Sequence, residues 1–140
     1  MDTACKKQVK FPTMNRKRTS RKKTRPARRS DCAVACTLDL VGDRWTLLVV
    51  RDLVSGKRYF DEFLRSPERI ATNILAARLR VLQEHGFIEK VRDPSDQRRW
   101  AYRFTQEGLP LRELLGHIAG WGHKYLPATK ILEGIKLPPT

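Results

Sequence analysis

The sequence predicts a mostly helical α+β domain that follows a basic tail, and three observations lead to this prediction. Apolar residues recur at helical spacing over most of residues 31–84 and again over residues 105–127. After Gly86 the apolar period changes from about 3.6 residues to about 2, which is the period of a β-strand. Positive charge is concentrated at the start of the chain: residues 1–30 hold 12 of the 29 lysines and arginines and one acid, Asp2, and so carry +11 of the net charge of +14.

Residues 1–30 are predicted to form a disordered basic tail, because they contain no apolar run whose burial could offset the entropy of ordering. A secretory signal needs an apolar stretch of about 7 to 15 residues. A membrane span needs about 20, and the sequence has neither. We therefore expect a soluble protein of the cytoplasm that has no membrane partner.

The chain has three cysteines, Cys5, Cys32 and Cys36. An odd number of cysteines without a secretory signal argues against a disulfide framework. Cys32 and Cys36 lie four residues apart on a predicted helix and have no evident His or Cys partner. We therefore expect buried packing for them, with no metal site and no cofactor.

The globular part is predicted to span residues 31–127 and to begin with two helices. The first helix starts at Asp31, a residue type that caps helix N-termini, and stops at Gly42, which tolerates a left-handed C-terminal conformation. The second helix is capped by Asp43 and ends at Gly56. Its residues are apolar nearly all round, which suits a helix in the middle of a small core.

A short strand and two further helices are predicted next. The aromatic residues Tyr59 and Phe60 favour a short strand. Asp61 is then expected to cap a helix of one or two turns, which Pro67 closes. The longer helix that follows has leucines at i, i+4 and i+7 and stops at Gly86. These leucines are Leu75, Leu79 and Leu82.

The segment FIEKVRDPSDQRRWAYRF, residues 87–104, is predicted to form a β-hairpin. Its DPSDQ turn has Pro at the second position and Asp and Ser side chains that can bond to the backbone. In the second strand Trp100, Tyr102 and Phe104 alternate onto one face, and Arg103 takes the other. Three arginines lie near the hairpin tip: Arg92, Arg98 and Arg99.

The last predicted helix begins after Thr105, which caps it, and ends near Pro127. Its apolar stripe consists of Leu111, Leu114, Leu115, Ile118, Trp121 and Tyr125. Gly116 and Gly120 weaken a helix by about 1 kcal/mol each relative to Ala, so we expect a partner packed closely against them. Residues 128–140 are expected to be a short, loosely held C-terminal tail.

The helix over residues 72–84 has an unusual outward face. With Leu75 at zero on a helical wheel, Asn73, Arg80 and Ala77 fall between about 140° and 200°. This face is small, polar and basic, whereas a solvent-exposed face usually carries Lys and Glu. Small residues allow DNA to approach closely, and Thr, Asn and Arg donate to phosphates or base edges. The face is therefore typical of a helix that enters the major groove.

Helix, helix, short strand, helix, helix and hairpin is the order of a winged helix-turn-helix. Residues 32–126 resemble the HxlR-type transcriptional regulators, which are relatives of the MarR-type regulators. The resemblance rests on the segments CAVACTLDLVGDRWTLL, RYFDEF, IATNILAARLRVLQEHGFI and YRFTQEG, and on Trp121 followed by Gly122. Ala33 departs from the Pro that family members often have after the first-helix Cys, and the DPSDQRR hairpin tip looks closer to the MarR type.

The resemblance implies a bacterial homodimer that binds double-stranded operator DNA and regulates transcription. The DNA-binding residues that it implies, together with the wheel, are Thr72, Asn73, Ala76, Ala77 and Arg80 of the recognition helix and Arg92, Arg98 and Arg99 of the wing. The dimer interface that it implies contains Leu111, Leu115, Ile118 and Trp121. Some relatives sense oxidants through the Cys that aligns with Cys32, which makes Cys32 a candidate thiol sensor. The effector is unknown.

No enzyme is predicted. His117 and His123 lie about 240° apart around a helix, and the sequence contains no evident nucleophile and base pair and no Gly-rich phosphate loop. One alternative of another class remains. In this alternative the chain is a basic RNA-binding or ribosome-associated protein in which the tail of residues 1–30 is the functional element.

Overall fold

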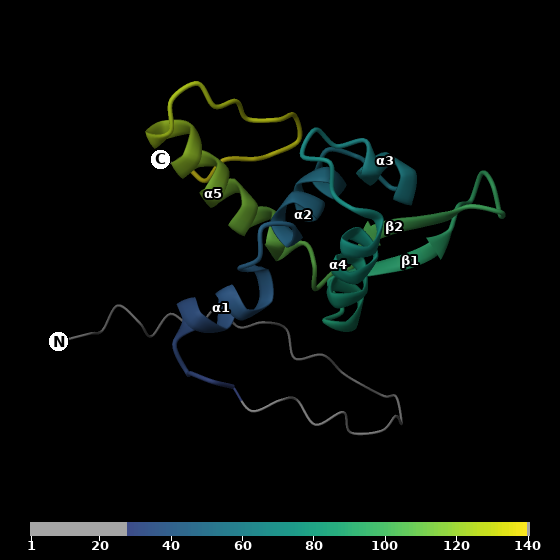
Figure 1. Ribbon diagram of the computed structural model, residues 1–140, viewed down its shortest axis with the longest axis horizontal. Helices are drawn as coiled ribbons and strands as arrows, with labels where there is room; N and C mark the ends of the chain where they lie inside the picture. The colour runs from purple at the N-terminus through teal and green to yellow at the C-terminus, as the bar shows by residue number, and fades with distance from the viewer. Residues whose placement is uncertain (1–27, 140) are drawn as a thin grey trace.

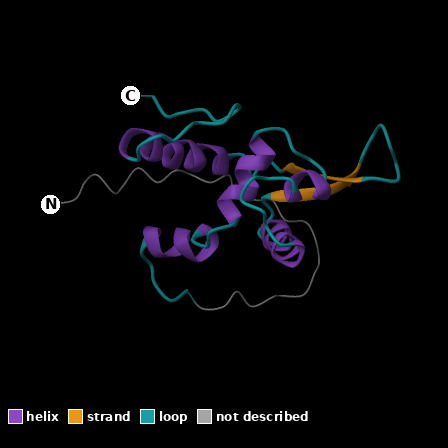
Figure 2. Ribbon diagram, turned by 45° about the horizontal axis from the view of Figure 1, so that its top comes forward, coloured by secondary structure: helices purple, strands orange, loops and turns teal. Residues whose placement is uncertain are grey.

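The computed structural model describes residues 28–139, in which five helices surround a two-stranded antiparallel hairpin (Figures 1 and 2). The elements are α1 (Ala33–Val41), α2 (Thr46–Val54), α3 (Phe60–Leu64), α4 (Thr72–Glu84), β1 (Ile88–Arg92), β2 (Trp100–Phe104) and α5 (Pro110–Tyr125). The mostly helical winged helix-turn-helix predicted from the sequence is confirmed. The predicted disordered tail lies outside the described residues, except for residues 28–30.

Helix α2 is the centre of the molecule and packs against α4, α5 and β2. Figure 1 shows α5 on one side of α2 and α4 with the hairpin on the other. The side chains of Val50, Phe63 and Leu75 are fully buried where these elements meet. Helix α1 lies at the edge of this body, and its buried residue is Val41, next to the turn into α2. The all-round apolar character of α2 therefore matches its central position.

The helix ends follow the predicted signals in part. Gly56 and Gly86 adopt φ values of 100° and 76°, the left-handed region that glycine tolerates, and follow the ends of α2 and α4 as predicted. Gly42 has a φ of −79°, so the left-handed end predicted for α1 is wrong. Asp31 is not the cap of α1 either. Cys32 occupies that position, and its backbone N–H donates to Ser30 Oγ at 3.1 Å.

The short strand predicted at Tyr59 and Phe60 is also wrong, because α3 already begins at Phe60. The Glu62 carboxylate accepts hydrogen bonds from the backbone N–H groups of Arg58 (2.7 Å) and Tyr59 (3.1 Å), which turns the chain into the helix. Glu62, and not Asp61, therefore provides the cap. The extended residue that does meet the sheet is Arg58, whose carbonyl accepts the N–H of Tyr102 at 2.8 Å.

The hairpin forms as predicted, with Ile88 opposite Phe104 and Arg92 opposite Trp100. Tyr102 is buried and meets the ring of Phe63 edge-on, with 6.3 Å between the ring centroids. This contact fixes the inner end of the hairpin on the helix-turn-helix. Trp100 is 43% exposed because it lies at the outer end of β2, beyond the core.

The segment after α5 is held against the body, unlike the loose tail expected for residues 128–140. Its backbone approaches α5 so closely that a Cβ placed on Gly116 would lie 2.1 Å from the Lys136 carbonyl oxygen. Ile135 packs against the core. The close partner expected at Gly116 is therefore a segment of the same chain. None of the helices in residues 28–139 is long and apolar enough to cross a membrane.

Candidate nucleic-acid interface

Helix α4 separates a buried face from an exposed face as the wheel predicts. Leu75, Leu79 and Leu82 are at most 1% exposed. On the opposite side Thr72, Asn73 and Arg80 are exposed, and two small residues between them, Ala76 and Ala77, are half-buried. Among residues 28–139 no hydrogen bond or ion pair engages the side chains of Thr72, Asn73 or Arg80. These side chains are available to a ligand.

The start of α4 is also open. Its N-cap is Ala71, and no side chain of the described residues bonds to the first turn. The first N–H groups of a helix lack partners within the helix and attract anions such as phosphates. The turn before α4 adds Arg65 and Arg69, which are both exposed. Positive charge and free donors therefore surround the N-terminal end of the helix.

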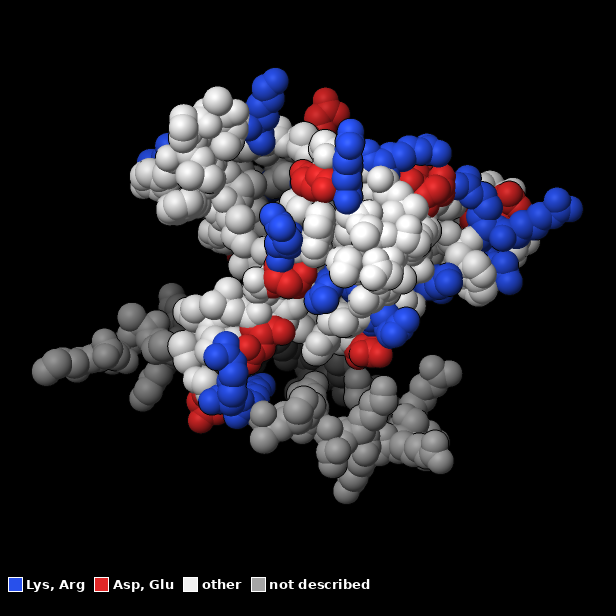
Figure 3. Space-filling view, viewed as in Figure 1, with Lys and Arg blue, Asp and Glu red and all other residues white. Residues whose placement is uncertain are grey.

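The three predicted wing arginines differ in their surroundings. The Arg92 guanidinium lies over the Trp100 ring, 3.9 Å from its centroid, and donates to the Gln97 carbonyl at 3.1 Å. Arg98 is exposed, and its side chain has no hydrogen-bond or ion-pair partner within residues 28–139. Figure 3 shows blue side chains gathered around the hairpin tip on the right of the molecule.

Arg99 is anchored to the helix-turn-helix. Its guanidinium lies 3.6 Å from the centroid of the Tyr59 ring, and Nη2 is 3.3 Å from an Asp61 carboxylate oxygen. An exposed ion pair of this kind contributes little stability by itself. Together with the aromatic contact, it ties the wing to the residues that begin α3.

A second tie between the wing and α3 was missed by sequence reasoning. The Tyr59 hydroxyl donates to the carboxylate of Asp93 at the base of the wing. The Ser95 hydroxyl and N–H also donate to Asp93, at 2.6 and 2.7 Å, and these bonds lower the pKa of the Asp93 carboxyl. The residues of the Tyr59–Asp93 pair are 34 positions apart, so spacing along the chain gives no signal for their contact.

Arg78 lies on the inner side of α4, and the sequence left three possible partners for it: Asp43, Asp52 and Glu62. The structure places Arg78 Nη1 3.6 Å from an Asp43 carboxylate oxygen. Partial burial raises the pKa of Asp43. Hydrogen bonds from Thr46 and Trp45 and the charge of Arg78 outweigh that effect, so the net shift is downward. Arg78 thus joins α4 to the start of α2 and is not part of the exposed face.

The predicted dimer residues divide into two groups. Leu111 and Leu115 are 7% and 6% exposed and belong to the chain's own core, so their assignment to a dimer interface is wrong. Ile118 and Trp121 are 47% and 60% exposed. The exposed apolar stripe of α5 continues to Tyr125, whose ring centroid is 5.3 Å from that of Trp121. On α1, Val34 and Leu38 are exposed as well.

The two described cysteines are free thiols. Cys32 is exposed at the N-cap of α1, so the buried packing expected for it is wrong. Cys36 is half-buried, and its Sγ lies 3.2 Å from the Ser30 carbonyl oxygen, to which it donates. Within residues 28–139 no group of three or more His, Cys, Asp or Glu side chains is arranged to hold a metal ion.

A helix-turn-helix with an exposed second helix and an adjoining basic hairpin defines a winged helix-turn-helix protein. The chain belongs to the HxlR-like helix-turn-helix family, whose model matches residues 40–130. It is 39% identical over 95 residues to the HTH-type transcriptional regulator Rv3095 of Mycobacterium tuberculosis, a match that covers 68% of this chain and 60% of the relative. It is 30% identical over 105 residues to the HTH-type transcriptional regulator YdeP of Bacillus subtilis, covering 75% and 82%.

Solved structures agree with this family assignment. The crystal structure of PA1607, described as a transcription factor, is similar with a TM-score of 0.66 and 38% identity, covering 80% of this chain and 82% of that one. The redox regulator HypR in its reduced form is similar with a TM-score of 0.57 and 26% identity, covering 66% and 92%. The described fold is therefore shared with named regulators.

Proposed function

We propose that this chain is a sequence-specific DNA-binding transcriptional regulator that acts on operator DNA as a homodimer. The observation that carries the proposal is the outward face of α4, which is small, polar and basic and has no partner among the described residues. The proposal gives the chain a binding role in the cytoplasm, with no catalytic role and no cofactor.

Direct reading of bases is the role proposed for α4. A major groove admits an α-helix, and Ala76 and Ala77 would let the helix backbone come close and touch a thymine methyl. Asn73 suits adenine, and Arg80 suits guanine, each through two hydrogen bonds. Thr72 lies in the first turn, where its hydroxyl and the free N–H groups suit a phosphate. These assignments divide the helix into positioning and reading parts.

The wing is proposed to contact the DNA that flanks the groove. Arg98 has the free side chain for a phosphate or for the minor groove. Arg92 and Arg99 remain exposed and retain unused N–H donors, but each is also held by an aromatic ring. We therefore expect Arg98 to contribute mainly to affinity, and Arg92 and Arg99 to contribute partly through the shape of the wing.

The dimer is proposed to form through the exposed apolar residues of α5 and α1. A monomer would leave Ile118, Trp121 and Tyr125 in water beside one another. A second copy that covered them, together with Val34 and Leu38 of α1, would bury a surface that an isolated soluble domain rarely exposes. A two-fold dimer would also present two α4 helices to two DNA half-sites.

Redox control through Cys32 is a further part of the proposal. HypR, which is similar in fold, is named a redox regulator, and Cys32 has the exposure that an oxidant requires. Mass spectrometry of protein treated with diamide or a quinone would test the idea. Modification of Cys32 with loss of operator binding is expected, and an unmodified Cys32 under conditions that alkylate other thiols would refute it.

Competition binding tests the main proposal against the RNA-binding alternative, which the family assignment does not favour. The protein should prefer DNA fragments that it has selected over bulk DNA and RNA at physiological salt. Deleting residues 1–30 should weaken selected and random DNA together, because Lys and Arg in a tail meet phosphates without reading bases. Equal binding to RNA and selected DNA, lost on deletion of the tail, would support the alternative instead.

A further inference from the structure

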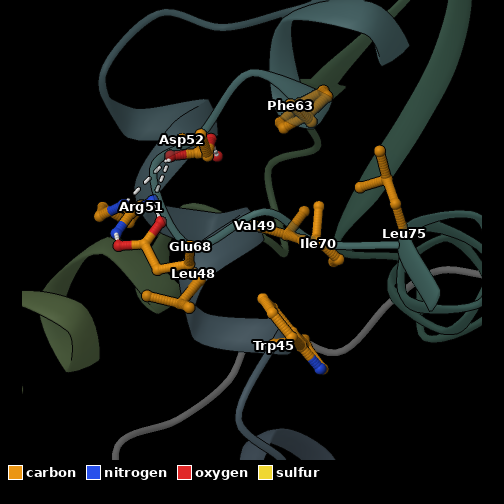
Figure 4. A pocket seen from close by; sticks show the side chains of 10 residues that line it. Trp45, Leu48, Val49, Arg51, Asp52, Phe63, Glu68, Ile70 and Leu75 are labelled. Carbon is orange, nitrogen blue, oxygen red and sulfur yellow. Dashed lines mark hydrogen bonds and ion pairs between the residues drawn. The ribbon is translucent and has the colours of Figure 1, made fainter. Parts of the chain in front are cut away.

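A charged cluster that base reading does not use lies between α2 and the turn that precedes α4. Arg51 on α2 donates from Nη1 and Nη2 to the two carboxylate oxygens of Glu68, at 2.5 and 2.8 Å. Its Nε and Nη2 also donate to one oxygen of Asp52, at 3.1 and 2.9 Å. Figure 4 shows Arg51 between these two carboxylates.

The second carboxylate oxygen of Asp52 extends the cluster into the turn. It accepts the hydroxyl of Ser66, which is 5% exposed, and lies 3.5 Å from Lys57 Nζ. Lys57 Nζ in turn donates to Ser66 Oγ at 2.5 Å. Two residues of the turn, Ser66 and Glu68, are thus bonded to side chains that α2 and the residues just after it provide.

The cluster is largely removed from solvent. The side chains of Arg51 and Asp52 are 11% and 6% exposed, and that of Glu68 is 36% exposed. Removing charges from water offsets much of the attraction between them, so a buried ion pair often stabilises a fold no more than apolar residues of the same size would. Because its net contribution to stability is small, the cluster calls for another role. Its strict bidentate geometry suits the fixing of position.

The turn itself contains an unfavourable backbone conformation. Arg69 has a φ of 55°, in the left-handed region that side chains other than glycine and asparagine rarely adopt. Such a conformation persists only where its surroundings impose it. Glu68 on one side is held by Arg51, and Ile70 on the other is 8% exposed in the core. Arg69 is therefore fixed between two anchored neighbours.

We propose that Arg51 is a positioning residue for DNA reading, which it serves by holding Glu68 and thereby the left-handed turn at Arg69. This turn sets the direction in which the chain enters α4, two residues later at Ala71. Arg51 lies on α2, behind the turn, and acts on discrimination through Glu68. The inference rests on the proposed function, because it concerns how α4 is presented to bases.

The test compares Glu68→Gln and Arg51→Met with the wild type on selected operator and on random DNA. Both variants should bind the operator about tenfold more weakly or worse, because a displaced α4 loses at least one bidentate base contact. Binding to random DNA should change by less than about twofold, since the number of phosphate contacts is unchanged. Arg103→Met is the matched control: it breaks an exposed ion pair with Glu89 on the hairpin and should leave operator preference intact.

Amide hydrogen exchange supplies a readout that needs no DNA. The N–H of Arg69 donates to the Ser66 carbonyl at 3.0 Å, and its protection should fall in Glu68→Gln while the β1 and β2 amides keep theirs. Glu68 is at the rim of the cluster, so this variant is expected to fold even if Arg51→Met does not. Wild-type operator preference in a folded Glu68→Gln protein, or unchanged exchange at Arg69, would overturn the inference. Absence of operator preference in the wild type, with Arg69 exchange altered as expected, would instead refute the proposed function.

Discussion

Arg78 and Arg80 are two residues apart on α4 and differ in their surroundings. Arg78 extends its stem along the core and places its guanidinium 3.6 Å from Asp43, whereas Arg80 is exposed and has no partner among residues 28–139. The helical wheel separated the two from the sequence, because a rotation of about 200° lies between them. For single residues, spacing alone therefore distinguishes an arginine of the fold from an arginine free to bind.

Replacing Arg80 with Ala should weaken operator binding by about 1 to 3 kcal/mol, the worth of a bidentate contact with guanine. Binding to random DNA should change little, because one phosphate contact at most is lost. Titrations of both DNAs at fixed salt would measure the difference. Arg112→Ala, which removes the same charge from α5, is the control, and an equal loss on both DNAs in Arg80→Ala would contradict base reading by this residue.

Replacing Asp43 with Asn should reduce stability at neutral pH and flatten its dependence on acid. The pKa of Asp43 is lowered from 3.8 in the folded chain, so its contribution to stability is complete above the unfolded pKa of about 3.9 and is lost as pH falls through the folded value. Urea unfolding between neutral pH and about pH 3 would measure this effect. An Asp43→Asn protein that lost as much stability in acid as the wild type would show that Asp43 is not a main contributor.

Contacts between residues far apart in the chain mark the limit of what the sequence predicts for single residues. The contact between Tyr59 and Asp93 depends on how the hairpin folds back on α3, and no local pattern encodes it. Leu111 and Leu115 were misassigned for a related reason. An apolar stripe at helical spacing shows that a helix has a covered face, but it does not show whether the cover is the same chain or a second copy.

Helix α5 is an element with three differently covered sides. Leu111 and Leu115 face the core, Ile118 and Trp121 face solvent, and Gly116 faces the backbone of residue 136. Its sequence predicted the helix and its end correctly, since the apolar stripe is long and Pro127 follows. The strand predicted at Tyr59 shows the opposite case, because the capping bonds of Glu62 override the β preference of aromatic residues.

Alanine substitutions at two glycines of α5 should have opposite effects. Gly116→Ala should displace residues 134–139, because its Cβ would lie 2.1 Å from a backbone oxygen that cannot move alone. Gly122→Ala would meet only Leu126 Cδ1, at 3.9 Å, and should stabilise the helix by up to about 1 kcal/mol. Thermal unfolding and amide exchange at Ile135 would measure both, and a stabilised Gly116→Ala protein with unchanged exchange would contradict the close approach.

In the molecule as a whole, α2 joins two surfaces with different proposed roles. On one side it supports α4 and the hairpin, and on the other it packs against α5. The DNA-reading face and the exposed apolar stripe of α5 are therefore parts of one rigid body. A dimer formed through α5 would fix the separation of two α4 helices, and so the spacing of the half-sites that they read.

Replacing Trp121 with Ala should abolish the dimer. Large aromatic side chains near the centre of an interface commonly contribute about 2 kcal/mol or more, and Trp121 is the most exposed aromatic residue of α5. Sedimentation at micromolar concentration should then show monomer or aggregate. Trp100→Ala removes an exposed tryptophan from the wing and should remain dimeric. A dimeric Trp121→Ala protein would place the interface elsewhere.

Sequencing of DNA fragments selected by the purified protein would examine base reading and two-fold symmetry in a single experiment. We expect an inverted repeat whose half-sites are centred about one helical turn apart, or a multiple of that distance. The same selection with Arg80→Ala should return the repeat with one symmetric pair of positions relaxed. Fragments without a shared motif, or a motif without two-fold symmetry, would contradict a homodimer that reads operator DNA through α4.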